Sequence, residues 1–95
     1  MAAYLCGNVR VTDPEGFKDY SGRVAAIVAA YGGRYLARGG AVERLEGDVT
    51  PNRAVLIEFA DMASLKAFYD SVEYRPLLAM RMRTAVSNIV AVEGL

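Results

Sequence analysis

The chain has 95 residues, of which 54% are hydrophobic and 23% are charged. This length suits one domain, residues 1–95, and the apolar fraction excludes a disordered chain. Eleven Lys and Arg residues balance eleven Asp and Glu residues, so no basic excess points to nucleic acid and no acidic tail points to a basic partner. A small domain has little interior, and this much apolar surface predicts a further buried face at an oligomer interface.

Cys6 is the only cysteine, and the chain has no histidine. We expect Cys6 to be a small strand residue rather than a nucleophile, because a lone thiol forms no intramolecular disulfide. The lack of histidine excludes His-based triads, His-ligated haem and most zinc sites, so we expect no metal and no cofactor. The sequence has neither an apolar run of the roughly 20 residues that span a membrane nor a signal peptide, which predicts a cytoplasmic protein without membrane contact.

The first half of the chain predicts a strand, a helix and a second strand. Residues 3–12 form the first strand, with a clean apolar face of Leu5, Val9 and Val11 and a mixed face of Tyr4, Cys6, Asn8 and Arg10. Asp13-Pro14-Glu15 is typical of a helix start, and Gly32-Gly33 of a helix end. The helix between them has an apolar stripe of Phe17, Tyr20, Val24, Ile27, Val28 and Tyr31. Residues 34–38 form the second strand, which Gly39-Gly40 breaks or bulges before residues 41–46 continue it.

The second half repeats this order after a turn at Gly47-Asp48 and Pro51-Asn52. Residues 53–60 form the most strand-like run, with Val55, Ile57 and Phe59 on one face and Ala54, Leu56, Glu58 and Ala60 on the other. Asp61 caps a helix that buries Met62, Leu65, Phe68 and Tyr69. A break follows at residues 71–75, because Pro76 is tolerated only near a helix start. The last helix continues the apolar face with Tyr74, Leu77, Leu78 and Met82, and residues 86–92 form a final strand whose core face the sequence does not reveal.

The two halves share a weak internal repeat. Asp13, Phe17, Lys18 and Tyr20 follow the first strand with the same spacing at which Asp61, Leu65, Lys66 and Phe68 follow the third. The order βαββαβ predicts an α+β protomer of the ferredoxin-like type, an antiparallel sheet with both helices on one face. Right-handed crossovers place the first and third strands in the centre. The other face, which carries Leu56, Tyr4 and Cys6, then predicts a homodimer through the open sheet face.

Six short motifs carry a family resemblance. In order, they are Val11-Thr12-Asp13-Pro14-Glu15, Tyr31-Gly32-Gly33-Arg34, Arg38-Gly39-Gly40, Glu46-Gly47-Asp48, Glu58-Phe59 and Tyr69-Asp70-Ser71-x-Glu73-Tyr74. Together they resemble the bacterial family called domain of unknown function 1330, over nearly the whole chain from Tyr4 to Gly94. Val72 departs from the proline that this family usually has there, which should only loosen the helix start.

The resemblance implies a dimeric α/β barrel, in which two ferredoxin-like chains stack their sheets face to face. Relatives of that architecture include cofactor-free monooxygenases, lactone isomerases, haem peroxidases and small-molecule-sensing domains. The family itself has no assigned reaction, so the resemblance implies fold and dimer but no chemistry.

Glu58 is the sharpest candidate for chemistry. A carboxylate on a central strand at an interface would be partly desolvated, so its pKa should rise unless a cation offsets this effect. Arg38 on a neighbouring strand is the expected partner, and Arg10 is the second choice. Glu58 would then be a general base or ligand anchor with Arg38 binding an anionic substrate, or the two would form a structural ion pair.

Four further residues have both a functional and a structural interpretation. Asn8 could donate a hydrogen bond to a ligand carbonyl or oxyanion, or could satisfy backbone groups. Tyr69 and Tyr74 could line a pocket mouth, or could be half-buried helix aromatics. Ser71 lacks a visible base and is interpreted as a cap.

Met80 and Met82, alternating with Arg81 and Arg83, suggest either an amphipathic surface contact or an ordinary helix end.

Two functional classes follow from these residues. The first is a non-catalytic homodimer that binds a small molecule or serves as an interaction module. The second is a cofactor-independent enzyme, similar to a monooxygenase or an isomerase, in which Glu58 is the acid or base and Arg38 and Asn8 anchor a small organic substrate. A pocket around Glu58 and Arg38 would favour the enzyme or the ligand binder.

Overall fold

The computed structural model describes residues 1–48 and 52–95. The elements follow in the order β1 (Ala3–Val11), α1 (Pro14–Ala30), β2 (Arg34–Arg38), β3 (Arg53–Phe59), α2 (Met62–Tyr69), α3 (Arg75–Thr84) and β4 (Ala85–Glu93). This order confirms the predicted ferredoxin-like α+β fold, with the second helical region broken between α2 and α3 where Pro76 required it.

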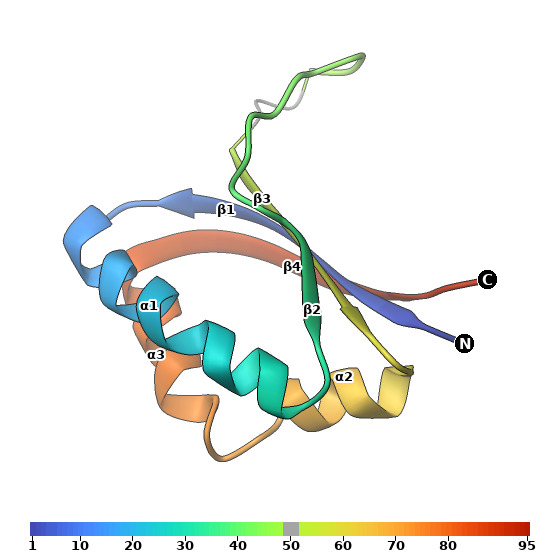
Figure 1. Ribbon diagram of the computed structural model, residues 1–95. Coiled ribbons are helices and arrows are strands. Elements are labelled where there is room, and N and C mark those ends of the chain that lie inside the picture. Colours follow the sequence, from blue (N-terminus) through green and yellow to red (C-terminus); the bar gives the residue numbers. More distant parts are fainter. Residues whose placement is uncertain (49–51) are drawn as a thin grey trace.

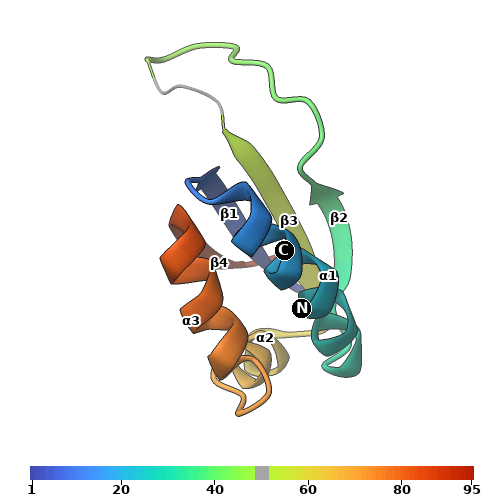
Figure 2. The same cartoon turned by 90° about the vertical axis from the view of Figure 1, so that its left-hand side faces the viewer.

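The four strands form one antiparallel sheet in the order β2-β3-β1-β4, so β1 and β3 are central as predicted. All three helices cover one face of this sheet (Figures 1 and 2). The register of β1 with β4 pairs Cys6 with Val90 and Tyr4 with Val92, which places these side chains together on the face away from the helices. The chain therefore leaves one sheet face open.

The core lies between the sheet and the helices. Phe59, Phe68 and Val28 are its most buried large side chains, each 1% exposed. The remaining buried apolar residues come from both layers, namely Ala3, Leu5, Val9, Phe17, Tyr20, Val24, Ile57, Leu65, Tyr74, Leu77 and Ala85. The helical and alternating patterns of the sequence thus select the core correctly on α1, β1 and β3.

Side-chain caps begin the helices where the sequence predicts them. The Gly16 N–H donates to Asp13 Oδ1 at 3.3 Å at the start of α1, and the Ser64 N–H donates to Asp61 Oδ1 at 2.7 Å at the start of α2. Ser71 closes the turn before α3, because its Oγ accepts a hydrogen bond from the Tyr74 N–H at 3.1 Å, whereas Tyr74, the N-cap of α3 itself, makes no side-chain cap. These caps satisfy backbone donors that helices leave unpaired.

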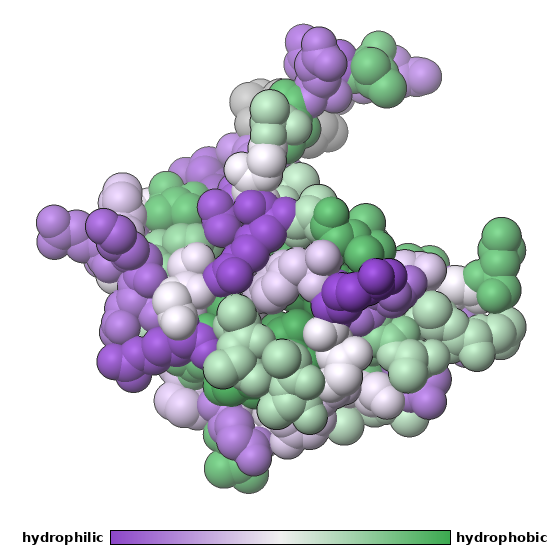
Figure 3. Space-filling model, viewed as in Figure 1, coloured by the Kyte–Doolittle hydropathy of each residue, from purple (hydrophilic) through white to green (hydrophobic). Residues whose placement is uncertain are grey.

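Two expectations, one for the segment between β2 and β3 and one for a residue of α3, were wrong. Residues 41–46 form no strand, because β3 begins only at Arg53 and pairs with β2 no further than Arg38 and Val55. The segment instead stands away from the sheet with Leu45 92% exposed (Figures 1 and 3). Met82, expected on the buried face of α3, is 67% exposed. Of the predicted turn, Pro51 lies outside the described residues.

A β-bulge in β2 decides which way its side chains point. Tyr35 pairs with Ile57 and Ala37 pairs with Leu56, so Leu36 is an extra residue between them. One extra residue reverses the alternation of the strand. Arg34 therefore shares the open face with Glu58, whereas Arg38 pairs with Val55 and lies on the helix side.

We predict opposite effects of alanine at two glycines. A Cβ at Gly33 would lie 2.6 Å from Val28 Cγ1 and 2.8 Å from Phe59 Cε1, whereas a Cβ at Gly22 in α1 would have no atom within 4 Å. Gly33→Ala should lower the free energy of unfolding by about 1–3 kcal/mol through overpacking. Gly22→Ala should raise it by about 0.5–1 kcal/mol, because alanine favours the helix. Urea unfolding at one fixed protein concentration measures both, and shifts of the same sign would contradict this account.

Candidate functional site

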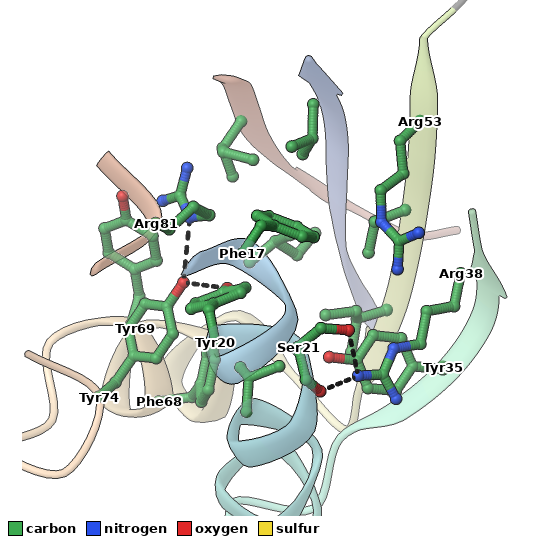
Figure 4. A pocket seen from close by; sticks show the side chains of 16 residues that line it. Phe17, Tyr20, Ser21, Tyr35, Arg38, Arg53, Phe68, Tyr69, Tyr74 and Arg81 are labelled. Atoms are coloured by element: carbon green, nitrogen blue, oxygen red, sulfur yellow. Dashed lines mark hydrogen bonds between the residues drawn. The ribbon is translucent and has the colours of Figure 1, made fainter. Parts of the chain in front are cut away.

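A cleft with a cavity of about 50 Å³ lies between the helices and the sheet. Its walls come from all three helices, the α2–α3 connection and the helix side of the strands (Figure 4). Aromatic and apolar residues form most of the lining, namely Leu5, Val9, Phe17, Tyr20, Val24, Tyr35, Val55, Ile57, Phe68, Tyr69, Tyr74 and Ile89. Ser21, Arg38, Arg53 and Arg81 complete it.

One end of the cleft is formed by a buried hydrogen-bonded chain. The hydroxyls of Tyr20 on α1 and Tyr74 before α3 lie 2.8 Å apart, and Arg81 Nε donates to Tyr74 Oη at 3.4 Å. Arg81 is only 5% exposed. Burial and the adjacent Tyr74 hydroxyl raise the pKa of Tyr20 far above its ordinary value, so its hydroxyl stays protonated.

Two more arginines lie on the opposite side of the cleft (Figure 4). Arg38 donates to the carbonyl oxygen and, at 3.3 Å, to Oγ of Ser21, and its guanidinium lies 4.5 Å from the centre of the Tyr35 ring. Arg53 lies 5.4 Å from the centre of the Phe17 ring, and its Nε is buried without a hydrogen-bond partner. The cleft thus contains three guanidinium groups from three different elements.

Gly7 in the middle of β1 leaves room for the side chain of Ile89 at the floor of the cleft. A Cβ at this position would lie 2.8 Å from Ile89 Cδ1 and 3.8 Å from Val55 Cβ, and both of these residues line the cavity. A glycine inside a central strand weakens the strand unless something must approach closely. This glycine interrupts the apolar face of Leu5 and Val9, and that interruption was a sequence signal for the site.

Glu58 does not face this cleft and does not contact Arg38. It lies on the open sheet face, where Arg34 Nη2 donates to Glu58 Oε1 at 2.7 Å. The bulge at Leu36 explains why the expected partner was wrong, since it turns Arg38 to the other side. The hydrogen bond from Arg34 lowers the pKa of the Glu58 carboxyl, although desolvation opposes this, and a hydrogen bond with Tyr4 adds to the lowering.

The remaining candidates divide between the two sides of the sheet. Asn8 pairs with Ala54 and Asn88 and shares the open face, away from the cleft. Arg38 and Tyr69 line the cleft, as does Tyr74. The structure therefore brings together the arginine and the tyrosines but separates them from Glu58 and Asn8.

Arg81 is the residue that the sequence interpretation missed. It was grouped with Met80, Met82 and Arg83 near the end of α3, yet it lies seven residues after Tyr74 and four after Leu77, both of which are buried. That spacing marks the buried face of a helix. A charged residue at such a position is itself a signal for a site.

A wider groove of about 420 Å³ runs between α2 and β4. It shares Leu5, Tyr69 and Ile89 with the cleft and also contains Lys66 and Asp70. Its lining has one charge of each sign and opens along the edge strand, so the cleft is the better-formed site.

Within residues 1–48 and 52–95, no group of three or more Cys, Asp or Glu side chains is arranged to hold a metal ion. Among the same residues, no helix is both long and apolar enough to cross a membrane.

Comparison with known families identifies the chain. The family described as domain of unknown function 1330 (DUF1330) matches residues 2–95. The chain belongs to this family. No curated protein matches the sequence.

Solved structures of the same fold are similar over nearly the whole DUF1330 chain. A protein of unknown function from Rhodopseudomonas palustris has a TM-score of 0.79 and 18% identity, covering 99% of this chain and 82% of its own. SnoaB, a cofactor-independent oxygenase from Streptomyces nogalater, has a TM-score of 0.70 and 17% identity, covering 99% and 93%. A dimeric ferredoxin-like protein of unknown function from Jannaschia sp. CCS1 has a TM-score of 0.62 and 16% identity, covering 99% and 100%. At these identities the likeness establishes the fold alone.

We predict that the contact of Glu58 with Arg34 stabilises the fold in a pH-dependent way. Because folding lowers the pKa of Glu58 from 4.5, its contribution is present above that value and is lost as the pH falls through the folded pKa. Glu58→Gln should therefore be less stable than the wild type at pH 7, and the difference should be smaller at pH 3. Urea unfolding at the two pH values measures this effect.

Glu43→Gln is the matched control, because Glu43 is exposed in the segment between β2 and β3. This variant should follow the wild type at both pH values. A deficit of Glu58→Gln that persists unchanged at pH 3 would show that the charge of Glu58 is not the cause.

Proposed function

We propose that this DUF1330 protein is a homodimer that binds a small organic molecule in the cleft between sheet and helices. The observation that carries the proposal is the convergence of aromatic rings and buried hydrogen-bond donors from α1, β2, β3 and α3 on one concave site. A few polar groups in an otherwise apolar pocket are typical of small-molecule sites.

Binding is favoured over catalysis by the chemistry of the cleft. Its lining, drawn from the described residues, contains no Asp, Glu, His, Lys or Cys that could serve as a base or nucleophile. The catalytic set of Glu58, Arg38 and Asn8 is spread over both sheet faces and does not form one site. An oxygenase-like activity, suggested by the fold of SnoaB, remains the alternative and would have to use the cleft tyrosines and arginines.

The homodimer is supported by the open sheet face. Val86, Val90 and Val92 of β4 are 53%, 62% and 50% exposed there. Cys6 and Leu56 continue the same apolar surface across β1 and β3. Exposed apolar patches of this kind mark contact sites, and the Jannaschia protein of the same fold is described as dimeric. A second copy lying face to face on this surface would cover it.

Filling the cavity should abolish ligand binding. Val55 is half-buried in the wall of the cleft, so Val55→Phe places a ring in a space of only about 50 Å³. A library of charged and neutral fragments, screened by NMR, should shift the methyl signals of Leu5, Val9 and Ile89 in the wild type but not in this variant. The matched control is Val72→Phe, because Val72 is 81% exposed and does not line the cleft. Binding that survives in Val55→Phe would remove the cleft from the proposal.

A charge on the open face should dissociate the dimer. The wild type should sediment at twice the 10.3 kDa mass of one chain, and Val90→Lys should sediment as a monomer, because a buried unpaired lysine is costly at an interface. Cys6 pairs with Val90 and reports on the same surface, so its thiol should react faster with Ellman's reagent in the variant. Val72→Lys is the control and should remain dimeric with a slow thiol. A monomeric wild type would contradict the proposed assembly.

A further inference from the structure

We propose that the cleft selects a small organic carboxylate and that Arg81 is its anchor. This inference rests on the proposed function and names the ligand class of the same site. It depends on the charge of the cleft, on the burial of one guanidinium and on the size of the cavity.

The charge of the cleft is uniformly positive. Arg38, Arg53 and Arg81 line it, and none of the described lining residues is acidic. Guanidinium groups in a concave, water-poor site raise the local concentration of anions. A neutral or cationic ligand would leave this charge uncompensated, whereas a carboxylate would balance it.

Arg81 is the strongest support for a carboxylate ligand, because it is buried and has no carboxylate partner among the described residues. It is 5% exposed, and no carboxylate of the described residues lies within 4.0 Å of its nitrogens. Its hydrogen bond to the Tyr74 hydroxyl favours the charged guanidinium, but this partner is a hydroxyl and not a carboxylate. A buried unpaired charge is strongly destabilising, so a residue of this kind is expected where a ligand supplies the missing partner.

The donors of Arg81 are also placed for a carboxylate. A guanidinium has five N–H donors, and Nε of Arg81 is the nitrogen that bonds Tyr74. Among the described residues no hydrogen bond occupies its two terminal nitrogens, which leaves the end of the fork available for both oxygens of one carboxylate. Bidentate contact of this kind favours planar anions over hydroxyl or amide groups.

Arg53 supplies a second unoccupied donor. Its Nε is buried without a partner, on the side of the cleft opposite Arg81 (Figure 4). Arg38 differs from both, because Ser21 and the Tyr35 ring already hold it and it lies at an exposed position. We therefore assign Arg81 as the anchor, Arg53 as a supporting donor and Arg38 as part of the entrance.

The cavity volume limits what enters. A cavity of about 150 Å³ accommodates benzene, and about 50 Å³ is a third of that volume. The enclosed space therefore suits a carboxylate group, and a ring attached to that group, as in benzoate, would lie in the part of the cleft that is open to solvent. The body of the ligand would lie toward the aromatic wall that contains Phe17 and Tyr69, which favours a planar or apolar body attached to the acid.

The test compares benzoate with benzamide, its neutral counterpart of nearly the same shape. NMR titration of the wild type should show benzoate shifting the methyl signals of Leu5, Val9 and Ile89, with benzamide binding at least about tenfold more weakly. Arg81→Met should weaken benzoate binding by at least about thirtyfold. Arg83→Met is the matched control, because Arg83 is an exposed residue of the same helix and does not line the cleft.

Thermal unfolding separates a binding role from a structural one. Replacing a buried charge by an apolar side chain of similar length is often neutral or stabilising, so Arg81→Met should melt no lower than the wild type. If Arg81→Met does not fold, Arg81→Lys is the test of binding. This variant keeps the positive charge but lacks the guanidinium that makes a bidentate contact, so it should bind benzoate about tenfold more weakly than the wild type.

Each outcome bears on the inference separately from the proposed function. Equal binding of benzoate and benzamide in the cleft would overturn the carboxylate assignment, although a ligand site would remain. Benzoate binding that survives in Arg81→Met would do the same. If Arg81→Met does not fold, unweakened binding of benzoate by Arg81→Lys would overturn the assignment instead. The same holds if only neutral fragments bind there. If no fragment of either class shifts the cleft methyls, the proposed function fails together with the inference.

Discussion

The hydrogen-bonded chain from Arg81 through Tyr74 to Tyr20 is the interaction on which the cleft depends. It joins α3 to α1 through two hydroxyls 2.8 Å apart that lie 54 residues apart in the sequence. Tyr74 also packs on Phe68, with ring centres 4.5 Å apart, so the hydroxyl pair and the aromatic cluster hold each other in place. Buried polar groups must keep their hydrogen-bond partners, so α1 and α3 cannot pack together at this end of the cleft as they would around an apolar core.

The bulge in β2 separates the two surfaces of the sheet. Arg34 and Arg38 are four residues apart in the sequence and would share a face in a regular strand. The extra residue Leu36 leaves Arg34 with Glu58 on the open face and sends Arg38 to the cleft. The open face therefore has a closed ion pair within an apolar surface, whereas the described lining of the cleft has three arginines and no carboxylate. These charges underlie the proposed interface on the open face and the proposed anion site in the cleft.

The contrast between Glu58 and Arg81 shows how burial and pairing decide which charged residue is available for a ligand. Glu58 looked reactive because it lies on a central strand, yet Arg34 and Tyr4 satisfy it and lower its pKa. Arg81 looked like an exposed helix residue, yet it is buried and lacks a carboxylate partner among the described residues. A charged side chain that already has a counter-ion gains little from a charged ligand, whereas one without a counter-ion gains a partner.

The fold could be predicted from the sequence because local signals agree along the chain. The caps at Asp13 and Asp61, the helical stripe of α1 and the alternation of β1 and β3 each act over a few residues, and topological rules then leave one arrangement. Residues 41–46 and Met82 were misassigned, because a strand needs a partner to pair with and α3 turns a different side to the core.

By itself, the sequence determined the element order, the central strands, the apolar open face and the family, since periodicity and capping are properties of short segments. Only the tertiary structure decided which charged residues meet. The extra residue Leu36 in the bulge turned the side chain of Arg38 to the helix side of the sheet. Packing of the helices brought Arg81 beside Tyr74 and Tyr20. Contacts between distant segments depend on register and burial, which no local pattern specifies.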